Sequence, residues 1–316
     1  MLLDARDRAI LDLLETDSRT PISHIAKKVK LSKDGIVYRI RRMEQEGIID
    51  GFYTVLNISK LGLVAHKVTI KFQNIDPEKE AGVIDYLEKA GIAGWIVSCD
   101  GRWDFMFISW TRSTYEFDRF FTKFLERYGS FIQDKELNIM TESHSCKRKY
   151  LVSTEPEESV YSGTPSQKDL DEVDLKLVRI MANNSRIRLL ELAKEVGMVP
   201  DSVSRRVRSL IDRGIMQRFR PILNTRILGY QFYNVMVRLN TPKGLGGIFE
   251  YLRQHPNVIH YSKYSGTFDL GIDVEIESPE KFREMMGEMK VKFSKEIRSY
   301  EPLLVYKQHK ITYSPF

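Results

Sequence analysis

Apolar positions near the start of the chain recur at the spacing of short helices. They predict a first helix over 4–15, a polar turn over 16–21 and a second helix over 22–29. Ser32 is a favourable N-cap residue, so a third helix is expected to begin there and to stop at Gly47. The following stretch, 48–62, is rich in β-formers and contains glycine, which predicts a two-stranded wing.

From Leu63 onward, segments with apolar residues at every second position, typical of strands, are interspersed with segments that have helical apolar spacing. Strands are expected over 65–72, 94–100, 103–110 and 131–140, and helices over 77–90 and 113–128. This β-α-β-β-α-β order is typical of a ferredoxin-like fold, a four-stranded antiparallel sheet with two helices on one face. The other face of the sheet is then left for another subunit or a ligand to cover.

The whole pattern occurs twice along the chain. The segment that starts at Leu3 aligns without a gap with the segment that starts at Leu170. The identical pairs include Asp4 with Asp171, Asp7 with Asp174, Ser18-Arg19 with Ser185-Arg186, Ala26-Lys27 with Ala193-Lys194, and Gly62 with Gly229. Further on, GRWDF at Gly101 matches GTFDL at Gly266, in a register that differs slightly from that of the first segments. The duplication therefore includes both parts of each half.

The duplication predicts an α+β chain with two winged helix-turn-helix domains and two ferredoxin-like domains in tandem. A first helix-turn-helix domain is expected over 1–62 and a first ferredoxin-like regulatory domain over 63–150. Residues 151–168 are rich in Ser, Thr, Pro and Glu, which is typical of a solvated linker. The second helix-turn-helix domain is expected over 169–229 and the second regulatory domain over 230–316.

Charge is concentrated where a helix-turn-helix domain would meet DNA. Such a domain places its last helix in the major groove. Between Arg19 and Arg42 the sequence has eight Lys or Arg and one acid, Asp34. A local excess of this kind can neutralise phosphates, whereas the net charge of +6 over the whole chain is too small to decide. On the second wing, Arg218 and Arg220 add further positive charge.

The third helix of each copy supplies the candidate DNA-binding residues. Ile36, Ile40 and Met43 form one apolar stripe. The opposite face is therefore expected to carry Asp34, Tyr38, Arg41 and Arg42 in the first copy and Asp201, Ser202, Arg205 and Arg208 in the second, with Lys33 at the exposed helix start and Arg206 on the flank. The candidates are Lys33, Asp34, Tyr38, Arg39, Arg41 and Arg42 in the first copy, and Asp201, Ser202, Arg205, Arg206 and Arg208 in the second. Ordinary solvated charges on a helix surface are the alternative interpretation, and the recurrence in both copies weighs against it. Because Tyr38 is matched by Arg205, the two helices need not recognise the same bases.

Several spaced motifs together resemble the Lrp/AsnC (feast/famine) family of prokaryotic regulators. They are LDxxDxxIL at Leu3, S-x-x-x-[IV]-x-x-R-[IV] at Ser32, EGII at Glu46, LNxxxLG at Leu56, and G-x-[WF]-D at Gly101 and Gly266. The resemblance implies binding of double-stranded DNA through the third helix. It also implies a regulatory domain that dimerises by sheet packing and senses amino acids or related small molecules near the G-x-x-D turn.

The resemblance makes four residues candidates for binding an effector: Gly101, Asp104, Gly266 and Asp269. The two aspartates could bind an effector amine, or they could only stabilise a turn. This chain departs from the family pattern because it is a tandem fusion. Its two regulatory domains are therefore expected either to pair as a pseudo-dimer within one chain or to assemble as a homo-oligomer. Val199-Pro200 also replaces the usual cap serine before the second recognition helix.

The remaining composition indicates no other chemistry. Cys99 and Cys146 are expected to be reduced thiols, and the six scattered histidines show no metal-ligand spacing, so neither a metal site nor a cofactor is predicted. The longest apolar runs fall well short of the ~20 residues that span a bilayer, and the N-terminus does not resemble a secretory signal. We expect a cytoplasmic protein with no membrane partner.

The sequence favours a sequence-specific transcriptional regulator over an enzyme. Two alternatives stay open. The same two-part layout occurs in sirohaem decarboxylases, and His260-Tyr261 lies in the corresponding strand, but the His-Asn-Tyr and Trp-Phe-Thr combinations of that group are absent. An architectural protein that coats DNA with little sequence preference is the other alternative.

Overall fold

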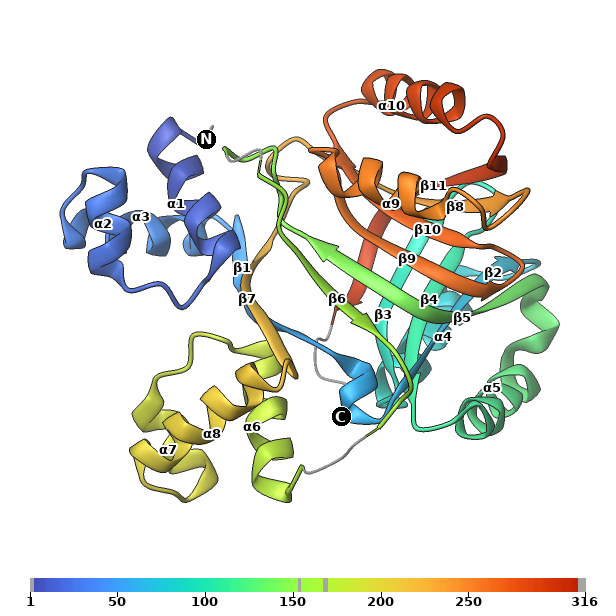
Figure 1. Cartoon of the computed structure of the whole chain (residues 1–316). Coiled ribbons are helices and arrows are strands. Elements are labelled where there is room, and N and C mark those ends of the chain that lie inside the picture. Colours follow the sequence, from blue (N-terminus) through green and yellow to red (C-terminus); the bar gives the residue numbers. More distant parts are fainter. Residues whose placement is uncertain (1–2, 153–154, 167–169, 312–316) are drawn as a thin grey trace.

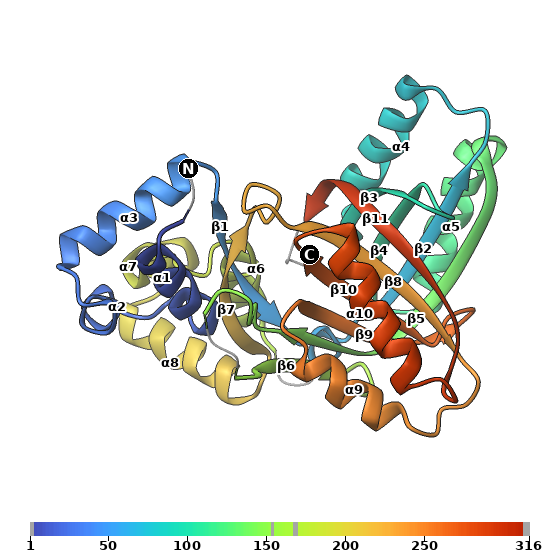
Figure 2. The ribbon, with the colours of Figure 1, turned by 90° about the horizontal axis from the view of Figure 1, so that it is seen from above.

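The computed structural model describes residues 3–152, 155–166 and 170–311. Parts of the expected linker, 153–154 and 167–168, and the ends of the expected outer domains, 1–2 and 312–316, lie outside the described residues, as does residue 169. Two helical units lie at one end of the molecule, and a large sheet with helices on its outer side lies at the other (Figures 1 and 2).

The first helical unit contains α1 (Ala5–Thr16), α2 (Ile22–Val29) and α3 (Lys33–Gln45), as the sequence predicts. Asp4 and Asp7 form a capping box at the start of α1. The Ser32 hydroxyl accepts a hydrogen bond from the Gly35 N–H at the start of α3 (3.0 Å). Local capping therefore defines where both helices begin.

The second helical unit repeats this arrangement with α6 (Glu172–Asn183), α7 (Leu189–Val196) and α8 (Pro200–Asp212). Helix α8 has no side-chain cap and begins with Pro200 at its first turn, where the missing N–H costs nothing. The turn between the second and third helices needs a left-handed residue in each unit. That residue is Gly197 (φ +68°) in the second unit but Lys30 (φ +57°) in the first.

The expected two-stranded wing within each unit is wrong. A single strand follows each third helix, β1 (Ile49–Leu56) and β7 (Met216–Leu223), and these two pair with each other as an antiparallel ribbon between the units (Figure 1). Tyr53 lies opposite Arg220, its equivalent in the second copy. Helix α1 packs on β7 and α6 packs on β1, so each unit uses a strand from the other. Each strand of this ribbon thus finds its backbone hydrogen-bond partner in the equivalent strand of the other copy, and not in a second strand of its own wing.

The second part of each half follows the predicted β-α-β-β-α-β order. In the first half it consists of β2 (Val64–Phe72), α4 (Pro77–Lys89), β3 (Ala93–Asp100), β4 (Phe105–Thr111), α5 (Thr114–Tyr128) and β5 (Ile132–Cys146). In the second half it consists of β8 (Gln231–Leu239), α9 (Leu245–Gln254), β9 (Val258–Gly266), β10 (Leu270–Ile276), α10 (Pro279–Lys292) and β11 (Ile297–Ile311). Short 3₁₀ turns occur at Ile58–Leu61 (η1) and Gly129–Phe131 (η2).

The two four-stranded sheets close into one barrel. Each half has its first strand in the middle, and the edge strands pair across the halves, β3 with β11 and β5 with β9. The resulting order β2-β4-β3-β11-β8-β10-β9-β5 closes because β5 also pairs with β2. The helices of both halves lie outside it (Figure 2). The sheet face that the sequence leaves open is thus covered by the other half of the same chain.

Part of the expected linker is a strand, so its description as a solvated segment is wrong there. Strand β6 (Glu158–Ser162) pairs with β5 between Glu142 and Cys146, and Ser159 is buried in it. On that side of β5, strand β2 pairs only as far as Met140. The linker therefore occupies a backbone edge that would otherwise be unpaired.

The duplication places equivalent residues against each other at the centre of the molecule. The Ser18 and Ser185 hydroxyls lie 2.9 Å apart, and the Lys67 ammonium donates to the Asn234 Oδ1 atom inside the barrel (2.7 Å). In both pairs the partners occupy the same position of the two copies. The two halves thus form a pseudo-dimer about an approximate two-fold axis. Within the described part of the chain, no helix is both long and apolar enough to cross a bilayer.

Candidate nucleic-acid interface

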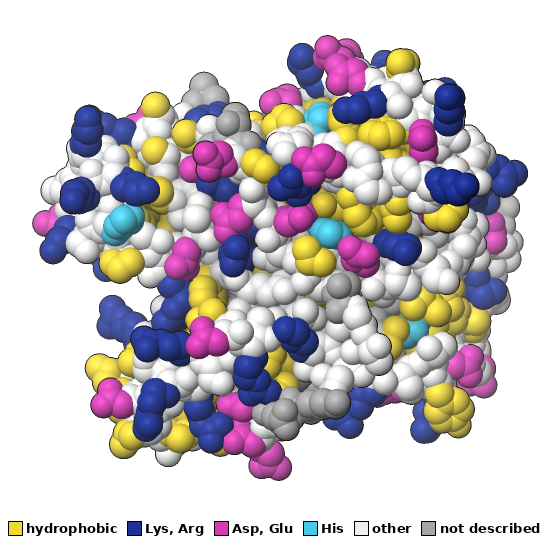
Figure 3. Space-filling view, in the orientation of Figure 1, with side chains coloured by type: hydrophobic (Ala, Val, Ile, Leu, Met, Phe, Trp, Pro, Cys, Tyr) yellow, Lys and Arg dark blue, Asp and Glu magenta, His cyan; other side chains and the backbone are white. Residues whose placement is uncertain are grey.

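Both third helices expose cations on the side away from their apolar stripes. On α3 the side chains of Lys33, Tyr38 and Arg41 are exposed, and on α8 those of Arg205 and Arg208 are exposed. The stripes themselves are buried, with Ile36 and Val203 fully enclosed. In Figure 3 a notch separates the two helical units, and Lys and Arg side chains gather on both sides of it. Together these residues give each unit a local positive surface.

Helix α2 extends the positive surface of the first unit. Lys27, Lys28 and Lys30 are exposed, as is His24. The equivalent helix α7 exposes Lys194 together with acidic residues. The second helix of the first unit therefore exposes more positive charge than the second helix of the second unit.

Three of the candidate arginines bind inside their own unit instead of pointing freely outward. Arg39 Nη1 contacts carboxylate oxygens of Asp4 and Asp7 at 2.7 and 2.8 Å, and Arg42 Nη2 contacts Asp7 at 2.6 Å. Asp7 is buried, and the two arginine side chains are only 19% and 18% exposed. The expectation that Arg42 faces outward is therefore wrong, and the candidate Arg39 is likewise paired, because carboxylates at the start of α1 bind both arginines.

Arg206 repeats this contact in the second unit. Its Nη1 atom lies 2.8 Å from both Asp171 and Asp174. The sequence signal for these pairs was the repeat of Asp4, Asp7 and Arg39 as Asp171, Asp174 and Arg206. The contact ties the third helix to the first and so orients the exposed face.

The contacts at the start of α1 lower the pKa of Asp4, the N-cap residue of that helix. The hydrogen bond from the Asp7 N–H and then the bond from Arg39 lower the pKa of Asp4 to about 2. The remaining acidic candidates, Asp34 and Asp201, are exposed near the starts of α3 and α8. Negative charge is favourable there because it faces the positive end of the helix. Ser202 is half-buried and accepts a hydrogen bond from Arg205 (3.3 Å).

Of the two arginines expected on the second wing, one is paired at the surface and the other is buried. Arg218 is 41% exposed and pairs with Glu157 (2.5 Å). Arg220 is fully buried, and its Nη1 atom donates to the Ser145 hydroxyl and the Cys146 carbonyl (2.9 and 2.8 Å). The pairing of β1 with β7 thus buries Arg220, which the sequence placed on an exposed wing.

The carboxylates of both G-x-x-D turns bind backbone amides of the sheet. Asp104 accepts from the Phe72 N–H (2.9 Å) and pairs with Lys71, and Asp269 accepts from the Leu239 N–H (2.7 Å). These contacts support the turn-stabilising interpretation over an effector amine.

The turn glycines lie against the opposite half of the barrel. A Cβ atom on Gly101 (φ +142°) would come within 3.0 Å of the Pro302 carbonyl, and one on Gly266 (φ +156°) within 2.8 Å of the Leu137 carbonyl. Both positions therefore need glycine for close strand packing.

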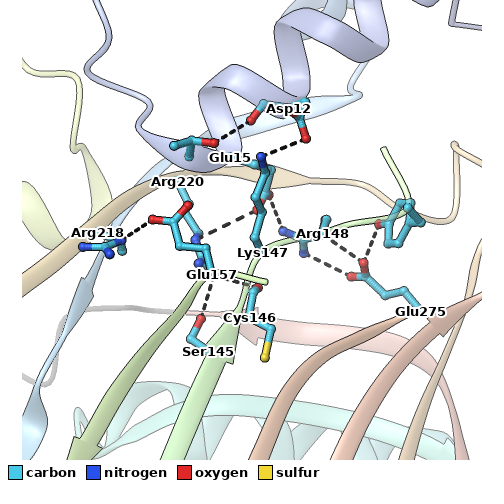
Figure 4. A network of polar contacts seen from close by, with 12 residues as sticks. Asp12, Glu15, Ser145, Cys146, Lys147, Arg148, Glu157, Arg218, Arg220 and Glu275 are labelled. Carbon is cyan, nitrogen blue, oxygen red and sulfur yellow. Dashed lines mark hydrogen bonds and ion pairs between the residues drawn. The ribbon is translucent and has the colours of Figure 1, made fainter. Parts of the chain in front are cut away.

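A buried network of ion pairs, which no motif in the sequence indicated, joins the first helical unit to the barrel (Figure 4). Arg148 binds Glu275 through Nε and Nη2 (2.9 and 3.1 Å) and binds Glu15 through Nη1 (2.6 Å). Both glutamates are buried, and Lys147 pairs with Asp12 beside them (2.9 Å). Burial alone would lower the pKa of Arg148, but the carboxylates of Glu275 and Glu15 raise it well above its usual value.

Comparison with known proteins agrees with this layout. The AsnC-type helix-turn-helix domain matches residues 3–44 and 170–211. The HTH-type transcriptional regulator LrpA of Pyrococcus horikoshii is 33% identical over 111 residues, which cover 35% of this chain and 77% of that protein. The proline dehydrogenase transcriptional activator of Rhizobium radiobacter is 29% identical over 123 residues, or 38% of this chain and 79% of that protein.

Among solved structures, the siroheme decarboxylase NirDL has the same arrangement over nearly the whole chain. The TM-score is 0.65, with 98% of this chain and 93% of that chain covered at 14% sequence identity. At this identity the likeness shows the fold alone. Two AsnC-type domains in tandem and the sequence relationship to LrpA together show that this chain belongs to the Lrp/AsnC family of helix-turn-helix regulators.

Proposed function

We propose that this chain is a sequence-specific DNA-binding transcriptional regulator of the cytoplasm, which inserts α3 and α8 into successive major grooves of double-stranded DNA. The observation that carries the proposal is that Arg41 and Arg208, equivalent residues of the two copies, are exposed on the third helices. Residues 1–62 and 169–229 then act as DNA-binding domains. The barrel domains, 63–150 and 230–316, act as regulatory domains that respond to a small molecule such as an amino acid.

Two kinds of contact are assigned to the exposed side chains. Lys33, Arg41 and Arg208 are suited to phosphates, which give affinity without sequence information. Tyr38 and Arg205 occupy equivalent positions on the outer face and are suited to base edges. An arginine there can bind guanine through two hydrogen bonds, which a tyrosine cannot do. We therefore expect an operator with two unlike half-sites.

A gel-shift titration at several salt concentrations tests the proposal. The DNA is first obtained by selecting bound sequences from a random pool. The double variants Lys33→Ala with Arg41→Ala, and Arg205→Ala with Arg208→Ala, should each weaken binding. For every phosphate that is no longer neutralised, the slope of log K against log salt should decrease by about 1. Unchanged affinity and slope in both double variants would contradict the proposal.

A matched control removes two cations elsewhere. Arg253 and Lys281 are paired with acids on α9 and α10, outside the helical units. The double variant Arg253→Ala with Lys281→Ala should therefore leave DNA affinity unchanged. If it weakened binding as much as the test variants, net charge alone would account for the result.

The half-site assignment has a test of its own. Replacing Tyr38 with arginine gives α3 the residue that α8 has at this position. The sequence selected by the first half-site should then shift toward guanine at one base pair, by about 1–3 kcal/mol of discrimination. An unchanged selected sequence would exclude Tyr38 from base contact. Selection that yields no preferred sequence at all would favour the architectural alternative.

A second candidate function is that of the siroheme decarboxylase, because the likeness of fold covers 98% of the chain. We favour the regulator and expect no enzymatic activity, since LrpA and the proline dehydrogenase activator, its relatives by sequence, are named as regulators. Adding siroheme and recording the visible spectrum discriminates the two. A stable shift of the tetrapyrrole bands together with release of CO₂ would favour the enzyme.

A further inference from the structure

A cavity of about 140 Å³ lies between the ribbon strand β1 and the mouth of the barrel. It is lined by Tyr53, Thr54, Val55, Leu56, Ile58, Trp110, Ser145, Tyr161 and His260. These residues come from the ribbon, from both halves of the barrel and from the linker strand β6. The cavity is therefore a place where a ligand would contact the strand that connects the two DNA-binding units.

One wall of the cavity is polar and consists of hydroxyl groups around an imidazole ring. His260 Nε2 lies 2.7 Å from the Tyr161 hydroxyl and 2.9 Å from the Ser143 hydroxyl. Its other nitrogen, Nδ1, lies 3.4 Å from an Asp273 carboxylate oxygen, which holds the ring in place. Ser145 accepts a hydrogen bond from Arg220, so its own hydroxyl hydrogen remains for a ligand.

A buried cation lies directly behind this wall. Arg220 is the cross-strand partner of Tyr53 and donates to Ser145, and both of these residues line the cavity. Its Nε and Nη2 atoms have no hydrogen-bond partner among the described residues, and the carboxylate of Glu15 lies 4.0 Å away. The lining itself contains no carboxylate among the described residues. The described lining therefore offers hydroxyl and imidazole groups to a carboxylate but no counter-charge to an ammonium group.

The opposite wall is apolar. Val55, Leu56, Ile58 and Trp110 supply it. A cavity of about 150 Å³ in another protein holds benzene, so the volume here suits a ligand of roughly six to nine non-hydrogen atoms. An aliphatic or aromatic group of that size would fill this side and displace no polar contact.

The duplication indicates that the site is specialised to one side of the molecule. In the register that aligns Gly101 with Gly266, the residue equivalent to Trp110 in the second half is Glu275. Glu275 binds Arg148 and Tyr150 (2.9 and 2.5 Å). In the second half, ion pairs therefore occupy the position that is equivalent to Trp110. In the first half, the cavity remains open beside Trp110 and Ser145.

We propose that this cavity binds a small monocarboxylate that has an apolar side group and no amine, such as a 2-oxo acid. The carboxylate lies against His260, Tyr161 and Ser145, and the side group lies against Ile58 and Trp110. Because β1 contacts the second helical unit through the Thr54 hydroxyl and the Met181 carbonyl (2.6 Å), occupancy would change how the two units are held. This regulatory consequence rests on the proposed function, whereas the binding does not.

Calorimetric titration with 4-methyl-2-oxopentanoate, benzoate and leucine tests the binding. Tryptophan fluorescence should report it as well, because Trp110 lines the site. The oxo acid is expected to bind at least ten-fold more tightly than leucine, which has the same side group but also an amine. Leucine binding as tightly as the oxo acid, or no binding by either carboxylate, would overturn the proposal.

Two variants locate the site. Ile58→Trp should fill the cavity and abolish binding, and His260→Gln should weaken binding about ten-fold. Ile227→Trp is the matched control, since Ile227 is 53% exposed and lies outside the cavity. A thermal melt of each variant verifies that it is folded. Wild-type affinity in folded Ile58→Trp protein would place the ligand elsewhere and refute the assignment; if that variant does not fold, His260→Gln decides.

A gel shift with and without the oxo acid separates this inference from the proposed function. Carboxylate binding without any DNA binding would support the ligand site and contradict the proposed regulator function. DNA binding without any carboxylate binding would support the regulator function and contradict the ligand site. A change of DNA affinity in wild-type protein that disappears in Ile58→Trp would support both.

Discussion

Replacing Arg148 with methionine should destabilise the fold strongly, because Arg148 is the shared partner of two buried carboxylates. Glu15 and Glu275 are 0% and 5% exposed, and Arg148 itself is 14% exposed. Methionine keeps most of the apolar stem but none of the hydrogen bonds. Both glutamates would lose a cation in the interior, where water cannot replace it.

The magnitude follows from the geometry of the network. Arg148 makes three charge-assisted hydrogen bonds, two to Glu275 and one to Glu15. Removing one partner of a buried ion pair typically costs about 3–5 kcal/mol, chiefly because the other charge stays buried. In a chain of this size that corresponds to a drop in Tm of roughly 5–8 °C.

Urea denaturation followed by circular dichroism gives the free energy of unfolding. Arg253→Met is the matched control, because Arg253 makes a partly exposed pair with Glu250 in which the side chains are 34% and 55% exposed. That control should cost less than about 1 kcal/mol. The double variant Arg148→Met, Glu275→Gln should recover part of the loss, because it removes one of the two uncompensated carboxylates, while Glu15 keeps the Arg220 guanidinium 4.0 Å away.

The reasoning is refuted if Arg148→Met costs no more than Arg253→Met. It is also refuted if the double variant Arg148→Met, Glu275→Gln is less stable than Arg148→Met alone. Either result would mean that the two glutamates are already adequately solvated without Arg148, and that the network does not hold the first helical unit to the barrel.

Three further predictions concern stability. Burial lowers the pKa of His66 to about 4, so the free energy of unfolding should fall by about 3 kcal/mol as the pH drops from 6.5 to 4. Urea titrations of His66→Phe should show a weaker pH dependence of stability, and an equal pH dependence in both proteins would mean that His66 is not its cause. Asp7→Asn, which weakens the bonds to Arg39, should cost about 2 kcal/mol by urea denaturation, and a neutral result would show that these pairs add nothing. Lys30→Gly should raise the free energy of unfolding by about 1 kcal/mol and Gly197→Lys should lower it similarly, because both positions are left-handed; a loss on Lys30→Gly would contradict this.

The identities that revealed the repeat also turn out to form its interface. Arg19 stacks over Phe219 and Arg186 stacks over Phe52, a reciprocal pair of contacts between the halves. Arg19 also donates to the Ser185 carbonyl. These contacts follow from a two-fold arrangement that no single copy of the sequence displays.

The sequence by itself determined the local elements, their order and the duplication. Apolar periodicity shows which face of a helix or strand is buried, and caps such as Ser32 show where a helix begins, because both depend on neighbours a few residues away. The pattern therefore identified α3 and α8 and the β-α-β-β-α-β order correctly.

Only the tertiary structure decided which strands pair and which charges are free. A strand needs a partner for its backbone groups, but its own side-chain pattern does not name that partner. β1 therefore pairs with β7 and not with a neighbour in the chain, which buries Arg220 and opens the cavity beside it. Likewise, helical geometry predicts that Arg39 lies outside the apolar stripe of α3. Only the tertiary position of α1 brings Asp7 within ion-pair distance of Arg39.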